Sequence, residues 1–274
     1  MIEIPEAKVL STQLTKELSG KKIHKVIAAQ NPHKFAWFSG DPDNYDDYLK
    51  NKTVEGSNYY GGQIELIAGD MVLVFSDGVN LYFHKDETTI PKKHQLLILF
   101  DDHTALSASI SMYGGLMCTP FGKNDNQYYL IAKEKPSIFC EKFGLDYFLS
   151  LFSDNDGKLS LKAFLATNQR IPGLGNGVLQ DILFNAGYHP KKKVISLIDR
   201  DKTRLYNAIK NTLVLMTERG GRDTEKDLYG NYGGYKTILS KNTVGNPCKR
   251  CGSKLVKEAY LGGSIYYCSG CQEL

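Results

Sequence analysis

The chain has 274 residues, of which 42% are hydrophobic and 23% are charged, and its formal net charge is +4. These values are typical of globular domains and exclude a disordered tail, a collagen and a disulfide knot. No apolar run approaches the length of a bilayer span, and the first residues lack the basic and apolar blocks of a signal peptide. We therefore expect an intracellular, cytoplasmic protein, nucleoid-associated if bacterial, that acts as a monomer and binds no membrane.

The charge is unevenly distributed along the chain. Residues 1–150 contain 15 Lys and Arg against 19 Asp and Glu, whereas residues 151–274 contain 19 against 11. A basic half favours a negatively charged partner, and nucleic acid is the commonest such partner. An ordinary solvated surface explains the same imbalance, so charge alone leaves both interpretations open.

The N-terminal segment predicts a helix, because Pro5 suits a first turn and Gly20 suits an end. Its apolar face would be formed by Val9, Leu10, Leu14 and Leu18. From about residue 21 to 135, short apolar runs alternate with Asp-Gly and Gly-Gly turn signals. This spacing, without intervening helices, predicts an antiparallel β-sandwich or barrel. Residues 136–158 are interpreted as a linker with a short helix.

From residue 159 the apolar period becomes helical. Ser160 is a candidate cap for a helix, and the break at 172–175 leads to a second helix that Asn176 is predicted to cap. The expected inward residues of these two helices are Leu161, Phe164 and Leu165, then Val178, Leu179, Ile182 and Leu183. Asp199 is predicted to open a longer helix, which ends at Gly220 and Gly221. Its inward residues would be Leu205, Ile209, Leu213 and Met216.

Four of the six cysteines form a metal-binding pattern near the C-terminus. Cys248 and Cys251 make one C-x2-C pair, and Cys268 and Cys271 make a second pair sixteen residues later. A hairpin between the pairs would bring four thiolates around one Zn²⁺ ion. Two disulfides are the alternative, which a reducing compartment disfavours. We expect one structural zinc ion per chain, which would stabilise a tail too small to fold alone.

The turn at 173–176 is a candidate anion site. A helix that begins after Gly-Leu-Gly-Asn leaves unpaired backbone N–H groups at the positive end of its dipole. A phosphate fits such a site, and the glycines allow close approach. A plain helix–helix turn with an Asn cap is the alternative interpretation.

The order of these features resembles the formamidopyrimidine-DNA glycosylase/endonuclease VIII family of base-excision enzymes. The segments that carry the resemblance are PGLGNGVLQDILFNAGYHP and PCKRCG…YYCSGCQ. The resemblance implies an α+β multidomain fold with an N-terminal helix, an antiparallel β-sandwich, a helix-two-turns-helix domain and a C-terminal zinc-finger β-hairpin. We expect the domains at 1–135 and 159–237, with the linker at 136–158 and the zinc finger at 238–274.

The resemblance also implies a function. Family members evert a damaged base from duplex DNA, and an N-terminal amine attacks the sugar C1′ to form a Schiff base that leads to strand cleavage. The catalytic segment would contain Met1, Ile2, Glu3 and Glu6. Glu3 would assist proton transfer during sugar ring opening, and Glu6 would hold the N-terminal segment. The residues expected at the DNA are Lys162, Gly175, Asn176, Met112, Tyr113, Lys249 and Arg250.

Several positions depart from the family pattern. Ile2 stands where the family has its nucleophilic proline, so we expect Met1 to be retained and the amine to lie one residue upstream. The family's strand lysine is replaced within 60–63, its intercalating arginine loop reads Ser-Met-Tyr-Gly at 111–114, and its hairpin arginine aligns with Gly263. The main prediction is a DNA glycosylase/AP lyase for oxidised or ring-opened bases or abasic sites. The alternatives are a catalytically impaired homologue that binds damaged or bent DNA, and a zinc-stabilised protein-interaction domain.

Overall fold

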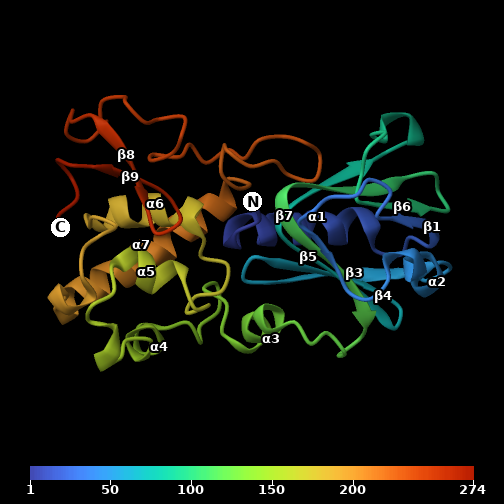
Figure 1. Cartoon of the computed structure of the whole chain (residues 1–274), viewed down its shortest axis with the longest axis horizontal. Coiled ribbons are helices and arrows are strands. Elements are labelled where there is room, and N and C mark those ends of the chain that lie inside the picture. The colour runs from blue at the N-terminus through green and yellow to red at the C-terminus, as the bar shows by residue number, and fades with distance from the viewer.

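The computed structural model describes all residues, 1–274. Two lobes lie side by side, a sheet lobe from the first half of the chain and a helical lobe that carries the β8–β9 hairpin (Figure 1). The N-terminus lies at the junction between the lobes, whereas the C-terminus lies at the far end of the helical lobe. The first residues are therefore placed to contact both halves of the molecule.

The sheet lobe begins with α1 (Ile4–Leu18), in which Leu10, Leu14 and Leu18 of the predicted apolar face are buried and Val9 is half-buried. The chain reverses at Gly20, which has a positive φ of 83°. The strands of this lobe are β1 (Ile23–Ala28), β2 (Ala36–Phe38), β3 (Val54–Tyr60), β4 (Gln63–Ala68), β5 (Met71–His84), β6 (Leu96–Phe100) and β7 (Ala105–Pro120).

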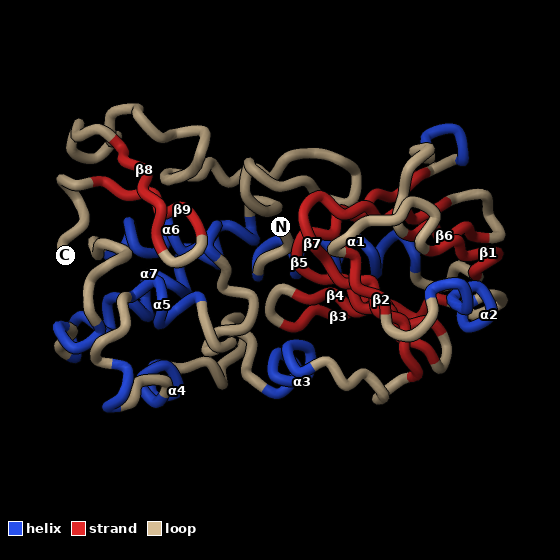
Figure 2. The backbone as a smooth tube through the Cα atoms, viewed as in Figure 1, coloured by secondary structure: helices blue, strands red, loops and turns tan.

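These strands form one sheet in the order β1-β6-β7-β5-β4-β3, with β2 added to β7. The long strands β5 and β7 pair with each other along most of their length, so they connect the β1–β6 side to the β4–β3 side (Figure 2). All pairings are antiparallel except that of β2 with β7. The apolar face of α1 and the inward residues of the strands share a single core.

Two short helices interrupt the β-rich region, and this corrects the expectation of strands without helices. They are α2 (Tyr45–Leu49) and α3 (Gln127–Glu134). The Asn126 side chain caps α3 by accepting a hydrogen bond from the Tyr129 N–H at 3.1 Å. Only Tyr129 and Ala132 of α3 are buried, so the sequence carries little helical periodicity there.

The helical lobe contains α4 (Leu145–Ser150), α5 (Leu161–Ala166), α6 (Asn176–Ala186) and α7 (Asp199–Glu218). The inward residues predicted for the last three helices are all buried in one core. Ser160 caps α5 as predicted, because its hydroxyl accepts from the Ala163 N–H at 3.2 Å. Strands β8 (Leu255–Tyr260) and β9 (Gly263–Cys268) form the C-terminal hairpin. None of the helices combines the length and the apolar character that a bilayer crossing requires.

The two lobes interlock at glycines. The β3–β4 turn at Gly61 and Gly62 lies directly on Pro172 and Gly173, so that a Cβ on Gly61 would come within 2.6 Å of the Pro172 carbonyl carbon. A Cβ on Gly173, whose φ is +76°, would overlap the backbone nitrogen of Gly62. The Gly173 carbonyl also accepts from the Ile4 N–H at 3.1 Å. This backbone contact sets how the helical lobe meets α1.

Gly173→Ala is expected to lower the free energy of unfolding by on the order of 3 kcal/mol, because the variant combines a strained positive φ with steric overlap. Urea denaturation measures this loss. Gly122→Ala is the matched control, because Gly122 has a φ of +74° but no atom lies within 4 Å of the position that a Cβ would take there. The control isolates the cost of the backbone conformation, about 1 kcal/mol. Equal losses in the two variants would show that the interlock contributes nothing.

Candidate active site and nucleic-acid interface

A cavity of about 630 Å³ opens between the lobes and is lined by residues of both. Six of the predicted site residues line it: Met1, Ile2, Glu3, Tyr113, Gly175 and Asn176. They come from the N-terminus, β7 and the start of α6, which are far apart in the sequence. The fold thus gathers three of the four expected catalytic residues, without Glu6, and part of the expected DNA-binding set around one opening.

The Glu3 side chain is buried against the N-terminal end of α6. One of its carboxylate oxygens accepts from the Gly177 N–H at 2.9 Å, and the other accepts from the Val178 N–H at 2.8 Å. A negative charge is favoured there by the unpaired N–H groups and the helix dipole. The candidate anion site does bind an anionic group, but at these two donors that group is a carboxylate of the same chain rather than a phosphate. Asn176 is likewise not the cap of α6, which begins at Asn176 itself with Gly175 at the capping position.

A buried arginine joins the two acids of the N-terminal segment. The Arg222 guanidinium lies 3.6 Å from Glu3 Oε2, and it donates to Glu6 at 2.8 Å through Nη2 and at 3.0 Å through Nε. All three side chains are almost fully buried. Burial raises the pKa of the Glu3 carboxyl above its ordinary value, while the Arg222 charge opposes this shift. Burial acts to lower the pKa of Arg222, but Glu3 and Glu6 outweigh it and raise that pKa.

Sequence reasoning missed Arg222, which follows the Gly-Gly pair after α7. The backbone supports the same cluster, because the Arg222 N–H donates to Glu6 Oε1 at 3.1 Å and Arg222 Nη2 donates to the Met1 carbonyl at 3.3 Å. Nothing in the local pattern distinguishes this arginine from a solvated one. Its partners are more than two hundred residues away in the sequence.

The Met1 amino group forms an ion pair with Glu225, a second residue that the sequence did not indicate. The next residue is held to the sheet, because the Ile2 N–H donates to the Asp77 carbonyl at 2.6 Å. Asp77 has a positive φ of 59° and lies at a register shift of β5. Burial raises the pKa of the Asp77 carboxyl, and the nearby amino-terminal charge lowers it in part. The amine is therefore held by the Glu225 carboxylate, and the Asp77 backbone anchors the next residue at the cavity.

Asn176 and Lys162 both point to the β8–β9 hairpin. Asn176 Nδ2 donates to the Ser264 carbonyl at 2.8 Å, and Lys162 Nζ donates to the Tyr260 carbonyl at 2.6 Å. Burial lowers the pKa of the Lys162 amine. Both groups lie close to Gly263, at 3.9 Å and 3.5 Å from the position that a Cβ would take there. Two nitrogen donors thus surround the hairpin position at which the family pattern has an arginine.

The remaining predicted DNA contacts are not gathered at the cavity. Met112 is 65% exposed and precedes Tyr113, but it does not line the cavity. Lys249 is exposed on the metal-binding tail. The Arg250 guanidinium lies over the Phe184 ring at 4.2 Å and donates to the Phe184 carbonyl at 3.3 Å. That ring is near the C-terminal end of α6, whereas the cavity is at its N-terminal end, so Arg250 lies away from the cavity.

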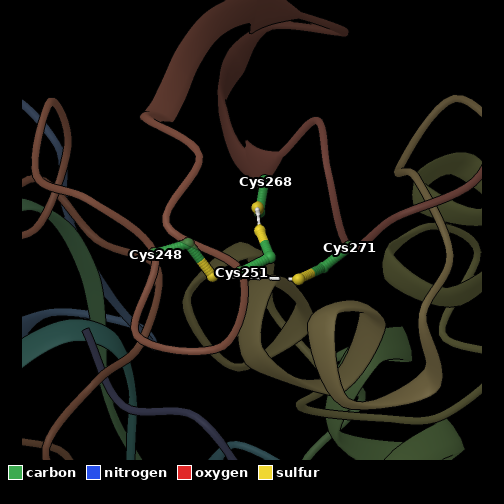
Figure 3. A group of neighbouring side chains, drawn as sticks. All are labelled: Cys248, Cys251, Cys268 and Cys271. Carbon is green, nitrogen blue, oxygen red and sulfur yellow. Dashed lines mark hydrogen bonds between the residues drawn. The ribbon is translucent and has the colours of Figure 1, made fainter.

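The four cysteines converge at the base of the hairpin (Figure 3). Their sulfur atoms all lie within 4.8 Å of one another, with Cys251 and Cys268 at 3.4 Å and Cys248 and Cys271 at 3.8 Å. Disulfide sulfurs lie at about 2.0 Å, so these distances exclude two disulfides. Four thiolates around one zinc ion, each at about 2.3 Å in a tetrahedron, would be separated by about 3.8 Å. The cluster therefore fits a single tetrahedral metal ion.

The fold is shared with solved structures of Fpg proteins. The Fpg of Lactococcus lactis in complex with DNA containing an abasic site superposes with a TM-score of 0.84, 22% identity and coverage of 99% of this chain and 100% of that one. MutM (Fpg) of Thermus thermophilus superposes with a TM-score of 0.80 and 20% identity, covering 98% of each chain. The chain thus has the fold of the Fpg proteins.

Sequence relatives give the same result over the full length. The formamidopyrimidine-DNA glycosylase of Bacillus anthracis is 27% identical over 278 residues, which is 99% of each chain. That of Lactobacillus johnsonii is 27% identical over 285 residues, covering 100% of this chain and 99% of the relative. No protein-family model matches the chain. The chain is thus similar to formamidopyrimidine-DNA glycosylases over its whole length, in fold and in sequence.

Proposed function

We propose that the protein is a DNA glycosylase/AP lyase that acts on oxidised or ring-opened bases, or on abasic sites, in duplex DNA. One observation carries the proposal: the Met1 amine and the Glu3 carboxylate lie at the same cavity between the two lobes. Relatives named as formamidopyrimidine-DNA glycosylases and a solved structure with abasic-site DNA support it. The excess of basic residues in 151–274 supplies the charge complement for phosphates.

The proposed chemistry uses the amine as the nucleophile. The unprotonated Met1 amine attacks the sugar C1′, the bond from C1′ to the base breaks, and the resulting Schiff base makes the neighbouring C–H acidic enough for elimination. Glu225, which holds the amine in the ion pair, is the nearest group to accept its proton. Glu3 is the group proposed to transfer a proton during ring opening, held in a single orientation by α6 and Arg222.

We propose that the cysteine cluster holds one Zn²⁺ ion with a structural role, because four thiolates leave no open coordination position. The proposed domain limits are 1–135 and 159–237, joined by the linker 136–158 and followed by the zinc finger at 238–274. Three hydrophobic cores support three units, but Ile138, Phe143 and Phe148 of the proposed linker are buried in the core of the helical lobe, and Leu228 is buried in the core of the sheet lobe. Asn176, Lys162 and Gly175 are the proposed phosphate contacts, with Lys249 as a more distant one.

Borohydride trapping on a duplex that contains an abasic site tests the enzyme proposal. The intact protein is expected to give a covalent adduct, and Glu3→Gln is expected to slow its formation by about a hundredfold or more, because a positioned acid or base contributes roughly 10²–10⁴ in rate. Glu55→Gln is the control, since Glu55 is exposed and forms no ion pair. An intact protein that binds the duplex without any adduct would instead be the impaired, non-cleaving homologue.

A further inference from the structure

The only tryptophan of the chain is held with half of its surface open to solvent. Trp37 is 51% exposed and lines the same cavity as Met1 and Glu3. It lies on β2, a strand of three residues whose sequence indicates no function. A large aromatic side chain is usually buried because it gains most from leaving water, so its exposure beside the cavity needs a reason.

The backbone fixes the position of Trp37. Strand β2 pairs in parallel with β7, with Ala36 opposite Gly114, Trp37 opposite Gly115 and Phe38 opposite Leu116. The Gly114 N–H also donates to the Phe35 carbonyl at 3.0 Å. The backbone that carries the indole is therefore part of the sheet rather than of a free loop. Little conformational entropy of this backbone is lost when a ligand binds.

The residue paired with Trp37 on strand β7 is Gly115, which leaves one side of the indole uncovered. Side chains at paired positions lie next to each other on the same face of a sheet, and the partner here is a glycine. A Cβ on Gly115 would approach Ser76 Oγ to 2.7 Å, so a larger residue there would displace the Ser76 side chain. The packing thus keeps a flat aromatic face open beside the cavity.

Aromatic and thioether groups connect this face to the amine. The Trp37 and Tyr113 rings lie 5.8 Å apart at 44°, and the Tyr113 hydroxyl is 3.8 Å from Met1 Sδ. A planar group stacked on the indole would therefore be separated from Met1, which carries the proposed nucleophile, by the Trp37 and Tyr113 side chains. Aromatic faces bind nucleobases by stacking, and a base becomes available for stacking when it loses its partner in the duplex.

We propose that Trp37, flanked by Tyr113, stacks on an unpaired nucleobase of the bound DNA and so favours duplexes that have lost a base pair. This inference rests on the proposed function, because it takes the cavity as the DNA site. It adds a recognition residue that is separate from the amine and from Glu3. A partner protein or a second copy of the chain on the same aromatic face is the competing occupant.

Tryptophan fluorescence tests the proposal directly, because all tryptophan emission of this protein comes from Trp37. The full chain is titrated with a duplex that contains a stable abasic analogue and with the fully paired duplex of the same sequence. Binding is followed independently by the anisotropy of labelled DNA. We expect strong quenching with the abasic duplex and little change with the paired duplex at equal saturation, since only the first offers an unpaired base.

The affinity of variants supplies the second readout. Trp37→Leu is expected to weaken binding of the abasic duplex by about tenfold, the lower part of the range for loss of one stacked base, and to change binding of the paired duplex by less than about twofold. Phe35→Leu is the matched control, because Phe35 is an aromatic residue 48% exposed just before the same strand but does not line the cavity. It should leave the preference for the abasic duplex unchanged.

Four results would overturn the inference. Abasic DNA that binds without quenching, or a Trp37→Leu variant that weakens both duplexes equally, would remove the stacking role and leave the proposed function standing. A change of sedimentation in Trp37→Leu would assign the face to a second copy of the chain. If neither duplex binds, the proposed function itself fails, and the stacking role fails with it.

Discussion

Replacing Arg222 by methionine is expected to lower the free energy of unfolding by about 3–5 kcal/mol, because it leaves buried carboxylates without their counter-charge. Methionine fills much of the same volume, so the loss reports on charge more than on a cavity. Glu3 and Glu6 are both nearly inaccessible to water, and Arg222 is the only basic side chain paired with either of them. Chemical denaturation at neutral pH measures the difference.

The loss of stability in Arg222→Met should increase as the pH rises. Burial already raises the pKa of Glu3 above 4.5, and removal of the guanidinium removes the charge that opposes this shift. A carboxyl with a raised pKa in the folded state binds more protons folded than unfolded, so its presence favours folding at low pH and disfavours it as pH rises. The Arg222→Met variant should therefore lose more stability at about pH 8 than at about pH 5.

Arg219→Met is the matched control, because Arg219 is three residues earlier, exposed and forms no ion pair. It should change stability by less than about 0.5 kcal/mol. Equal losses in the two variants, or an Arg222 loss that stays constant with pH, would contradict a buried charge cluster. The same cluster holds the Met1 carbonyl, so the variant is also expected to loosen the N-terminal segment at the cavity.

The elements with strong periodicity could be predicted from the sequence. Helices α1, α6 and α7 have apolar residues at helical spacing, and the turns that end them contain glycine, so both signals agree. The cysteine pairs could also be assigned from the sequence, because their spacing alone defines a tight turn on each side of a hairpin. The short α3 could not, because two buried residues make no pattern.

The details of the site could not be predicted because they depend on residues far apart in the chain. Glu3 and the start of α6 are separated by more than 170 positions, and no local rule states that a distant carboxylate will cap that helix in place of Asn176. Arg222, Glu225 and Trp37 have ordinary sequence surroundings. They become functional candidates only when the sheet lobe and the helical lobe meet at the N-terminus.

Removal of the metal that we propose for the cysteine cluster is expected to unfold the tail from about residue 247 while both lobes stay folded. The small core around the hairpin has five buried residues, and only Leu255 and the ligands Cys248 and Cys268 come from this segment. Structural zinc contributes about 10–16 kcal/mol in isolated finger peptides, which exceeds anything that so small a core supplies. Chelation followed by hydrogen exchange should show loss of protection in β8 and β9, with β4 and β5 unchanged.

The same treatment should weaken DNA binding, because the hairpin is held against the proposed phosphate contacts. Unfolding of the tail would break the hydrogen bonds from Asn176 to Ser264 and from Lys162 to Tyr260. Cys251→Ser should reproduce the effect of the chelator, whereas Cys140→Ser, outside the cluster, should leave metal content and binding unchanged. Elemental analysis that finds no metal in a tail that remains protected from exchange would show that the cysteines need no ion. Metal binding would then have no effect on the proposed phosphate contacts.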